Sequence, residues 1–215
     1  YGIAGLVLFV FRNLPPRRLL VLATAFMILQ TLISVMEWHD FRDTQQQAEA
    51  ANARQAAGQV LTGDDYEALE AYSVLQSEWR PDRDDLEGMV ANIRDSYASA
   101  FAVLRTHTWF METEFFFRHG IVECLGMMLL GMALLKLGVL TGASSTRTYL
   151  LMVVVGYAIG LTVNTLEIRE IEGSGFAPEV LVRSFMTYDL GRIPMTLAHL
   201  GVIGLLCRTS WLADV

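Results

Sequence analysis

The sequence predicts an all-α membrane protein, a polytopic bundle of about five transmembrane helices with a helical extramembrane insertion. Two observations lead to this fold class. The chain of 215 residues is 53% hydrophobic and 18% charged, whereas about a quarter of the residues of a soluble domain are charged. Most of the charge falls between residues 37 and 118, and long uncharged runs lie on both sides. We therefore expect the lipid bilayer to be the surroundings of this chain.

Five apolar runs supply the predicted spans: 1–11, 19–36, 120–140, 148–166 and 193–207. The first run is too short to cross a membrane alone. Because the chain is apolar from Tyr1 onwards, we interpret it as a fragment that lacks N-terminal helices. The resulting organisation has membrane helices one and two in residues 1–40, a polar helical block in 41–112, and membrane helices three to five in 113–211.

The short turns between the spans predict the orientation in the membrane. Basic residues occupy one set of turns: Arg12, Arg17, Arg18, Lys136, Arg147 and Arg208. Basic loops stay in the cytoplasm, so the 41–112 block is expected to be extracytoplasmic. The formal net charge of -7 argues against a nucleic-acid partner, because a phosphate-binding surface needs clustered Lys and Arg.

Within the polar block we expect several helices. Residues 45–60 indicate a polar helix, and Thr62 offers the start of another. Further on, apolar residues recur at helical spacing in one stripe that we expect to lie against the membrane domain. The stripe consists of Ile93, Tyr97, Phe101 and Leu104. Trp109 and the phenylalanines after it suit the membrane interface.

His119 and Glu123 are the candidate catalytic residues. Ionisable groups in membrane segments usually face a bundle interior or a watery cavity. The two residues are four positions apart, so on an α-helix they share a face. A carboxylate beside an imidazole can orient it as a general base. The alternative is an interfacial pair whose charges reach back to water.

Arg192, His199 and Asn164 are the candidate substrate-binding residues. Arg192 opens the last span, and His199 follows almost two turns later on the same face, with Asp189 near the mouth of the cavity that this face could line. An arginine there could hold a phosphate or carboxylate. The alternative is structural: Arg192 anchors the helix end, while His199 and Asn164 bond within the bundle.

The remaining motifs concern packing. Gly156 and Gly160 have the Gly-x-x-x-Gly spacing that lets another helix approach closely, and Gly126 and Gly131 are expected to do likewise. Cys124 and Cys207 lie far apart without the spacing of a metal site. We expect no metal and no bound cofactor.

Residues 125–142, LGMMLLGMALLKLGVLTG, resemble the YeiB-type family of bacterial membrane proteins, catalogued as domain of unknown function 418. The segments 1–23, 93–105 and 191–208 are similar to further parts of that family, so the resemblance covers essentially the whole chain. It places Glu123 where an acidic residue is usual, and His199 where His or Tyr is usual. The family's opening helix, with its Arg-Gly pair, has no counterpart here.

This resemblance implies a place in the transmembrane acyltransferase superfamily and in the bacterial inner membrane. Such proteins move an acyl group, often acetyl from acyl-CoA, to a hydroxyl or amine acceptor across the membrane. The acceptor would be an envelope glycan, a lipid or a small metabolite. Two alternatives stay open: a transporter whose ionisable groups form a proton relay, and a non-catalytic membrane partner of another envelope protein. The sequence leaves the oligomeric state open.

Overall fold

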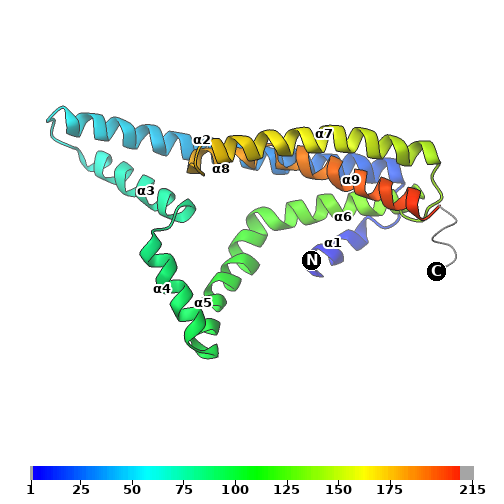
Figure 1. The fold of residues 1–215 in the computed structure, drawn as a ribbon, viewed down its shortest axis with the longest axis horizontal. Helices are drawn as coiled ribbons and strands as arrows, with labels where there is room; N and C mark the ends of the chain where they lie inside the picture. The colour runs from blue at the N-terminus through cyan, green and yellow to red at the C-terminus, as the bar shows by residue number, and fades with distance from the viewer. Residues whose placement is uncertain (1, 209–215) are drawn as a thin grey trace.

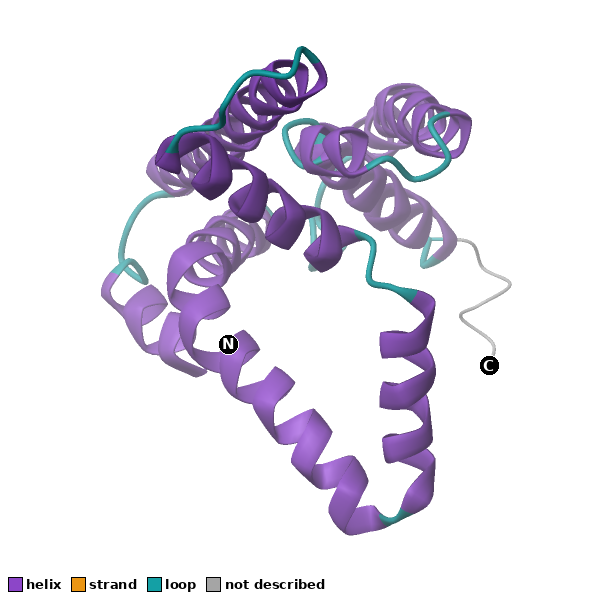
Figure 2. Ribbon diagram, turned by 90° about the vertical axis from the view of Figure 1, so that its left-hand side faces the viewer, coloured by secondary structure: helices purple, strands orange, loops and turns teal. Residues whose placement is uncertain are grey.

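The structure is a computed structural model that describes residues 2–208 (Figure 1). Within these residues it contains helices and loops and no strand, which confirms the predicted all-α fold class (Figure 2). In chain order the helices are α1 (Gly2–Val10), α2 (Pro16–Ala56), α3 (Gly63–Trp79), α4 (Arg83–Asp95), α5 (Tyr97–Phe110), the π-helix η1 (Met111–Gly120), α6 (Ile121–Lys136), α7 (Thr146–Gly173), α8 (Pro178–Ser184) and α9 (Tyr188–Leu206). The predicted end of the last membrane segment, at 211, lies outside the described residues.

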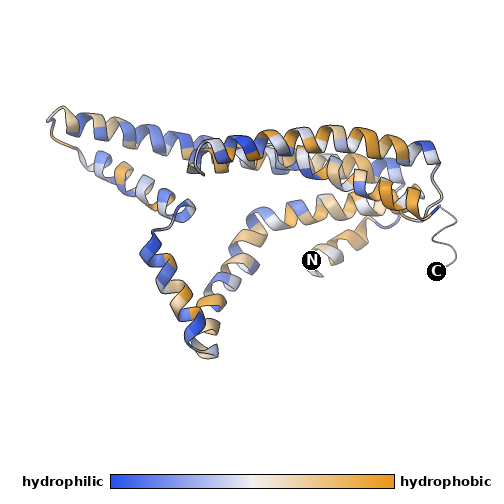
Figure 3. Cartoon of the chain, viewed as in Figure 1, coloured by the Kyte–Doolittle hydropathy of each residue, from blue (hydrophilic) through white to orange (hydrophobic). Residues whose placement is uncertain are grey.

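Three helical segments are long and apolar enough to cross a membrane: Pro16–Ala56, Tyr97–Lys136 and Thr146–Gly173. Their apolar parts lie in the bundle, while the far half of α2 is polar (Figure 3). This supports a membrane protein, but the predicted count of about five spans is not confirmed. α1 has 9 residues, and the apolar part of α9 begins only after Arg192. Each is shorter than the roughly 20 residues that one span needs.

The bundle consists of two helix pairs. α7 packs along α9, and α2 packs along α6, with α1 also against α6. The core between α2 and α6 contains four residues that are at most 1% exposed: Leu19, Ala23, Leu129 and Ala133. Since the bundle is small, most other large apolar side chains of the spans face outwards, as expected where lipid covers the outer face.

Small residues form the seam between α7 and α9. A Cβ atom added to Gly156 would lie 2.4 Å from the carbonyl oxygen of Pro194 and 2.8 Å from Cβ of Ala198. A Cβ on Gly160 would lie 3.0 Å from the backbone nitrogen of Met195. The two backbones can approach this closely only because α7 has no side chain at these positions. The predicted role of Gly156 and Gly160 in close helix packing is confirmed.

The other pair of glycines differs from the prediction in one member. A Cβ on Gly126 would lie 3.3 Å from Cβ of Phe26 on α2, so Gly126 sits in the α2–α6 contact. A Cβ on Gly131 would meet no atom within 4 Å. Gly131 therefore does not serve close packing among the described residues. Five positions separate it from Gly126, so it lies on a different face of α6.

Basic side chains tie the helix ends together where α6 and α9 terminate. Nζ of Lys136 donates a hydrogen bond to the carbonyl oxygen of Leu14 at 2.7 Å. A guanidinium nitrogen of Arg208 donates a hydrogen bond to the carbonyl oxygen of Gly142 at 2.7 Å. Between them, Tyr149 is 0% exposed, and its hydroxyl donates to the carbonyl oxygen of Val139 at 2.7 Å. This end of the bundle is therefore closed by turns held against helix termini.

α2 continues from the bundle into the polar block without a break. The predicted domain boundary at residue 40 falls inside α2, and the one at 112 falls inside η1. After α2 the chain reverses, and α3 packs back along it. Thr62 caps α3 as expected: its backbone N–H donates to Asp65 at 2.9 Å, and Asp65 also pairs with Arg54 of α2. The polar half of α2 is thereby held by α3.

The stripe expected on one helix is divided between two. α4 ends at Asp95, and Ser96 caps α5, accepting a hydrogen bond from the backbone N–H of Ser99 at 3.1 Å. α5 then runs through η1 into α6 as one bent helical course. In Figure 1, α4 and α5 form a V that leaves the bundle beside its polar end.

Candidate functional site

Charged residues from four helices, α2, η1, α6 and α9, meet at the end of the bundle that adjoins the polar block. Glu37 lies on α2, His119 and Glu123 at the junction of η1 and α6, and Asp189 and Arg192 at the start of α9. They form two ionic clusters. One joins α6 to α9 and the other joins α2 to η1.

The first cluster centres on Arg192. One guanidinium nitrogen pairs with Glu123 of α6, and the other donates to Asp189 at 2.6 Å. The guanidinium also lies over the ring of Tyr188, 4.6 Å from its centroid. Side-chain exposure is 24% for Arg192 and 34% for Glu123, so water reaches part of the cluster. Because two carboxylates face one arginine, the cluster carries an excess negative charge when all three are ionised.

A small cavity borders this cluster, between α2, α6 and α9. It contains about 160 Å³ of empty space, with no room for a whole water molecule. Two of its lining residues each have a buried polar atom without a hydrogen-bond partner among the described residues: Oε1 of Gln30 and Nε of Arg192. One is an acceptor and the other a donor. Such unpaired buried groups are uncommon and call for a physical explanation.

The second cluster centres on His119. Its Nε2 lies 3.0 Å from Oε1 of Glu37, and its ring lies 5.2 Å from that of Phe115. Nε of Arg118 is 3.8 Å from the same carboxylate oxygen. The imidazole is mostly buried, at 16% exposure. The predicted arrangement of an imidazole oriented by a carboxylate is therefore present, but the carboxylate differs from the expected one.

His119 and Glu123 do not pair with each other, contrary to the spacing argument. The wide turns of η1 end at Gly120, between the two residues, so ideal α-helical spacing does not apply there. Each residue also finds an opposite partner on another helix. Glu123 meets the permanent positive charge of Arg192, and charge-assisted bonds to arginine are strong. Spacing within one helix gives no information about such partners.

The other predicted binding residues, His199 and Asn164, contact residues other than Arg192. His199 is exposed, its Nδ1 lies 2.7 Å from the carbonyl oxygen of Met195, and its ring meets that of Tyr157 edge to face at 5.4 Å. Asn164 packs against the backbone of α9, because a Cβ on Gly191 would come within 2.0 Å of its Oδ1. Thus Arg192 and His199 do not share a site, and Asn164 serves the α7–α9 contact.

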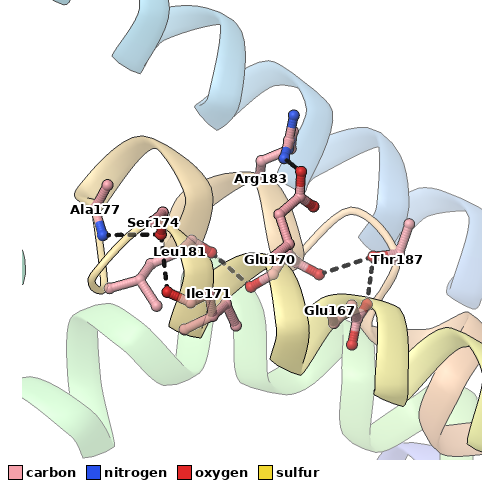
Figure 4. A network of polar contacts seen from close by, with 9 residues as sticks. Glu167, Glu170, Ile171, Ser174, Ala177, Leu181, Arg183 and Thr187 are labelled. Carbon is pink, nitrogen blue, oxygen red and sulfur yellow. Dashed lines mark hydrogen bonds and ion pairs between the residues drawn. The ribbon is translucent and has the colours of Figure 1, made fainter.

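A polar network beside the site fixes the approach to α9. Arg183 of α8 pairs with Glu170 of α7, and the hydroxyl of Thr187 donates to Glu167 (Figure 4). The backbone N–H of Ala177 donates to Ser174 at 3.2 Å (Figure 4). These contacts hold the loop that places Asp189 and Arg192 at the start of α9.

Sequence reasoning missed Glu37 and Gln30 as members of the site. Two signals were available in the sequence: Gln30 is the one amide in the uncharged run 19–36, and Glu37 is the first charged residue after that run. No group of three His, Cys, Asp or Glu residues that could hold a metal occurs in residues 2–208. No protein-family model, curated protein or solved structure matches the chain. The resemblance to the YeiB-type family therefore stays a prediction.

Proposed function

We propose that this chain belongs to a multi-pass bacterial inner-membrane acyltransferase that moves an acyl group from acyl-CoA to a hydroxyl or amine acceptor. The proposal combines the YeiB-type resemblance with one structural observation. Arg192, with its unpaired Nε–H, and Gln30, with its unpaired Oε1, line the same small cavity, and Glu123 also lines it. A hydroxyl or amine is the chemical group that complements this pair, because it accepts one hydrogen bond and donates another.

The residues have distinct roles in this proposal. Nε–H of Arg192 donates a hydrogen bond to the acceptor's oxygen or nitrogen, and Oε1 of Gln30 accepts a hydrogen bond from the acceptor's O–H or N–H. These bonds orient the acceptor until Glu123 takes that proton. The acceptor attacks the thioester carbonyl carbon, a bond forms there, and the carbon–sulfur bond breaks. Glu123 takes the acceptor's proton, which passes to the departing CoA thiolate. Because the cavity is too small even for water, the side chains around it move apart to admit the acceptor.

His119 and Glu37 stand nearer the mouth. Glu37 follows Gln30 by two turns of α2, which at 1.5 Å per residue is about 10 Å. The imidazole therefore contacts the part of the acceptor outside the cavity, or relays its proton to water. The basic turns at the opposite end support an extracytoplasmic mouth. In this proposal the anionic phosphates of acyl-CoA bind at those basic turns, and its pantetheine arm extends along the bundle so that the thioester meets the acceptor at the cavity.

The distribution of ionisable residues favours this proposal over a transporter. A proton relay needs titratable groups through the thickness of the membrane. Residues 19–36 and 148–166 contain no Asp, Glu, Lys, Arg or His, and 124–135 contain none either. For these three segments the ionisable groups lie instead at the ends, and His199 in α9 is the one such residue within the apolar run 193–207. No contact in the structure specifically favours a non-catalytic role as a partner of another protein. The experiment below includes this role as one of its outcomes.

The test is transfer of labelled acetyl from acetyl-CoA in membranes that contain the protein. We compare wild type with Glu123→Gln, Arg192→Lys and His119→Ala. Arg192→Lys keeps the charge but loses the planar fork and its Nε–H. The matched control is Glu112→Gln, the same chemical change at an exposed position on η1.

We expect label on an envelope component with wild type and with Glu112→Gln. Glu123→Gln and Arg192→Lys, inserted at the wild-type level, should reduce transfer at least tenfold. Absence of transfer or acetyl-CoA binding by wild type would refute the acyltransferase and leave the partner role. Unchanged transfer by Glu123→Gln and Arg192→Lys would show that the reaction takes place elsewhere than at this cavity.

A further inference from the structure

One arm of the molecule has a surface that nothing in the site uses. It consists of α4 and α5, residues 83–110, and is called the α4–α5 arm below. Neither helix contains a buried residue, and η1, which follows them, contains none either. Such a long helical segment without a core of its own needs another surface to cover its apolar side chains.

The arm is amphipathic. On α4 the exposed apolar residues recur at helical spacing and form one stripe: Leu86, Met89, Val90 and Ile93, at 36–44% exposure. On α5 they continue with Tyr97, Phe101 and Leu104, at 50–86% exposure. The residues between them are mostly charged, polar or small, with Val103 as an apolar exception. This pattern is typical of helices that lie in the plane of a membrane interface.

The α4–α5 arm continues directly into a membrane helix, which indicates that the lipid bilayer covers its apolar side chains. α5 runs through η1 into α6, and this course of 40 residues is one of the three segments able to cross a membrane. The junction carries exposed aromatic side chains, among them Trp109 at 71% and Phe117 at 61%. Aromatic residues gather where a span leaves the hydrocarbon core. The arm therefore begins at the level of the lipid headgroups.

The direction of the arm agrees with this placement. In Figure 1 the bundle helices run together, and the V of α4 and α5 extends from them across their direction. Figure 2, turned by 90°, shows the two helices spread widely beside the bundle. A segment that runs across the spans, starting from the membrane edge, follows the membrane surface.

We propose that the α4–α5 arm binds the outer surface of the lipid bilayer through its apolar stripe. Charge defines the kind of lipid. Residues 83–105 contain three arginines and four carboxylates, so the polar face lacks the basic excess that attracts anionic lipid. The arm fits a zwitterionic phospholipid surface and anchors through apolar and aromatic side chains.

The test uses a single tryptophan as a reporter of depth. In a background with the four native tryptophans replaced by phenylalanine, Phe101→Trp places the reporter on the arm. The control is Val60→Trp in the same background, at the 93% exposed turn after α2. The protein is reconstituted in phosphatidylcholine vesicles whose acyl chains carry bromine either close to the headgroup or close to the chain end. Retained helix content by circular dichroism and vesicle insertion confirm that each variant is folded.

We expect short-wavelength emission from Trp at 101, at least twofold stronger quenching by the shallow bromines than by the deep ones, and no change when phosphatidylglycerol is added. Trp at 60 should emit at long wavelength without quenching. Long-wavelength, unquenched emission from 101 would overturn the proposal in favour of a solvated arm. Short-wavelength emission without quenching would overturn it in favour of cover by protein, such as a second copy.

Discussion

The seam between α7 and α9 makes a quantitative prediction about Gly156→Ala. The added Cβ would lie 2.4 Å from the carbonyl oxygen of Pro194 and 2.8 Å from Cβ of Ala198. Packed carbon atoms lie about 3.5–4.0 Å apart, so the two helices must separate locally by about 1 Å. Both obstacles belong to α9 rather than to a flexible side-chain end, so neither can simply rotate away.

The magnitude follows from two opposing effects. Overpacking a close contact lowers the free energy of unfolding by about 1–3 kcal/mol. Replacing glycine by alanine in a helix raises it by up to about 1 kcal/mol. We expect a net destabilisation of about 1–2 kcal/mol, which in a chain of this size lowers Tm by several degrees, at roughly 2–4 °C per kcal/mol. Thermal unfolding in detergent micelles, followed by tryptophan fluorescence, measures it.

Gly131→Ala is the matched control. It makes the same chemical change in a membrane helix, but its Cβ would meet no atom within 4 Å. Its Tm should be unchanged or slightly higher. If both variants unfold at the same temperature, close packing at Gly156 does not stabilise the bundle and the argument from the seam is refuted.

Three further predictions concern other parts of the molecule. Tyr149→Phe leaves the carbonyl oxygen of Val139 without its 2.7 Å bond, so thermal unfolding should show a loss of about 1–3 kcal/mol; an unchanged Tm would contradict this. Hydrogen bonds from Thr62, together with the charge of Arg54, hold the pKa of Asp65 below its usual value. The unfolded chain then binds the proton more readily, so α3 is fully stabilised above about pH 4 and loses this contribution as the pH falls further. Circular dichroism of wild type and Asp65→Asn should therefore converge in acid, and a constant difference would count against the pair. Ser144→Cys, in a cysteine-free background, should react with an impermeant maleimide only after cells are opened; labelling of intact cells would reverse the proposed orientation.

The parts of the fold that rest on local patterns could be predicted from sequence. The apolar runs predicted the all-α fold and three of the spans, because hydropathy directly reflects burial in lipid. Gly156 and Gly160 predicted a close helix contact, and Thr62 predicted the start of α3. Each of these features depends on a short stretch of chain.

The parts that depend on partners distant in sequence could not be predicted. Glu123 and Arg192 are 69 positions apart, and no periodicity relates them. The wide turns of η1 were equally invisible, so His119 was assigned to Glu123 rather than Glu37. Gly131 shows the limit of a motif: a small residue permits close approach, but only the arrangement of the helices determines whether a neighbour is there.

The unbroken course of α2 has a mechanical consequence. Because α2 has no hinge at the membrane boundary, a tilt of its apolar half also tilts the polar half, as a rigid lever would. About twenty residues of α2 extend past that boundary, or about 30 Å at 1.5 Å per residue. A tilt of about 10° inside the bilayer therefore swings the far end through about 5 Å, by the same geometry. Since α3 is fastened along the lever by Asp65 and Arg54, it moves with it. A change in the tilt of this span would therefore displace the polar block.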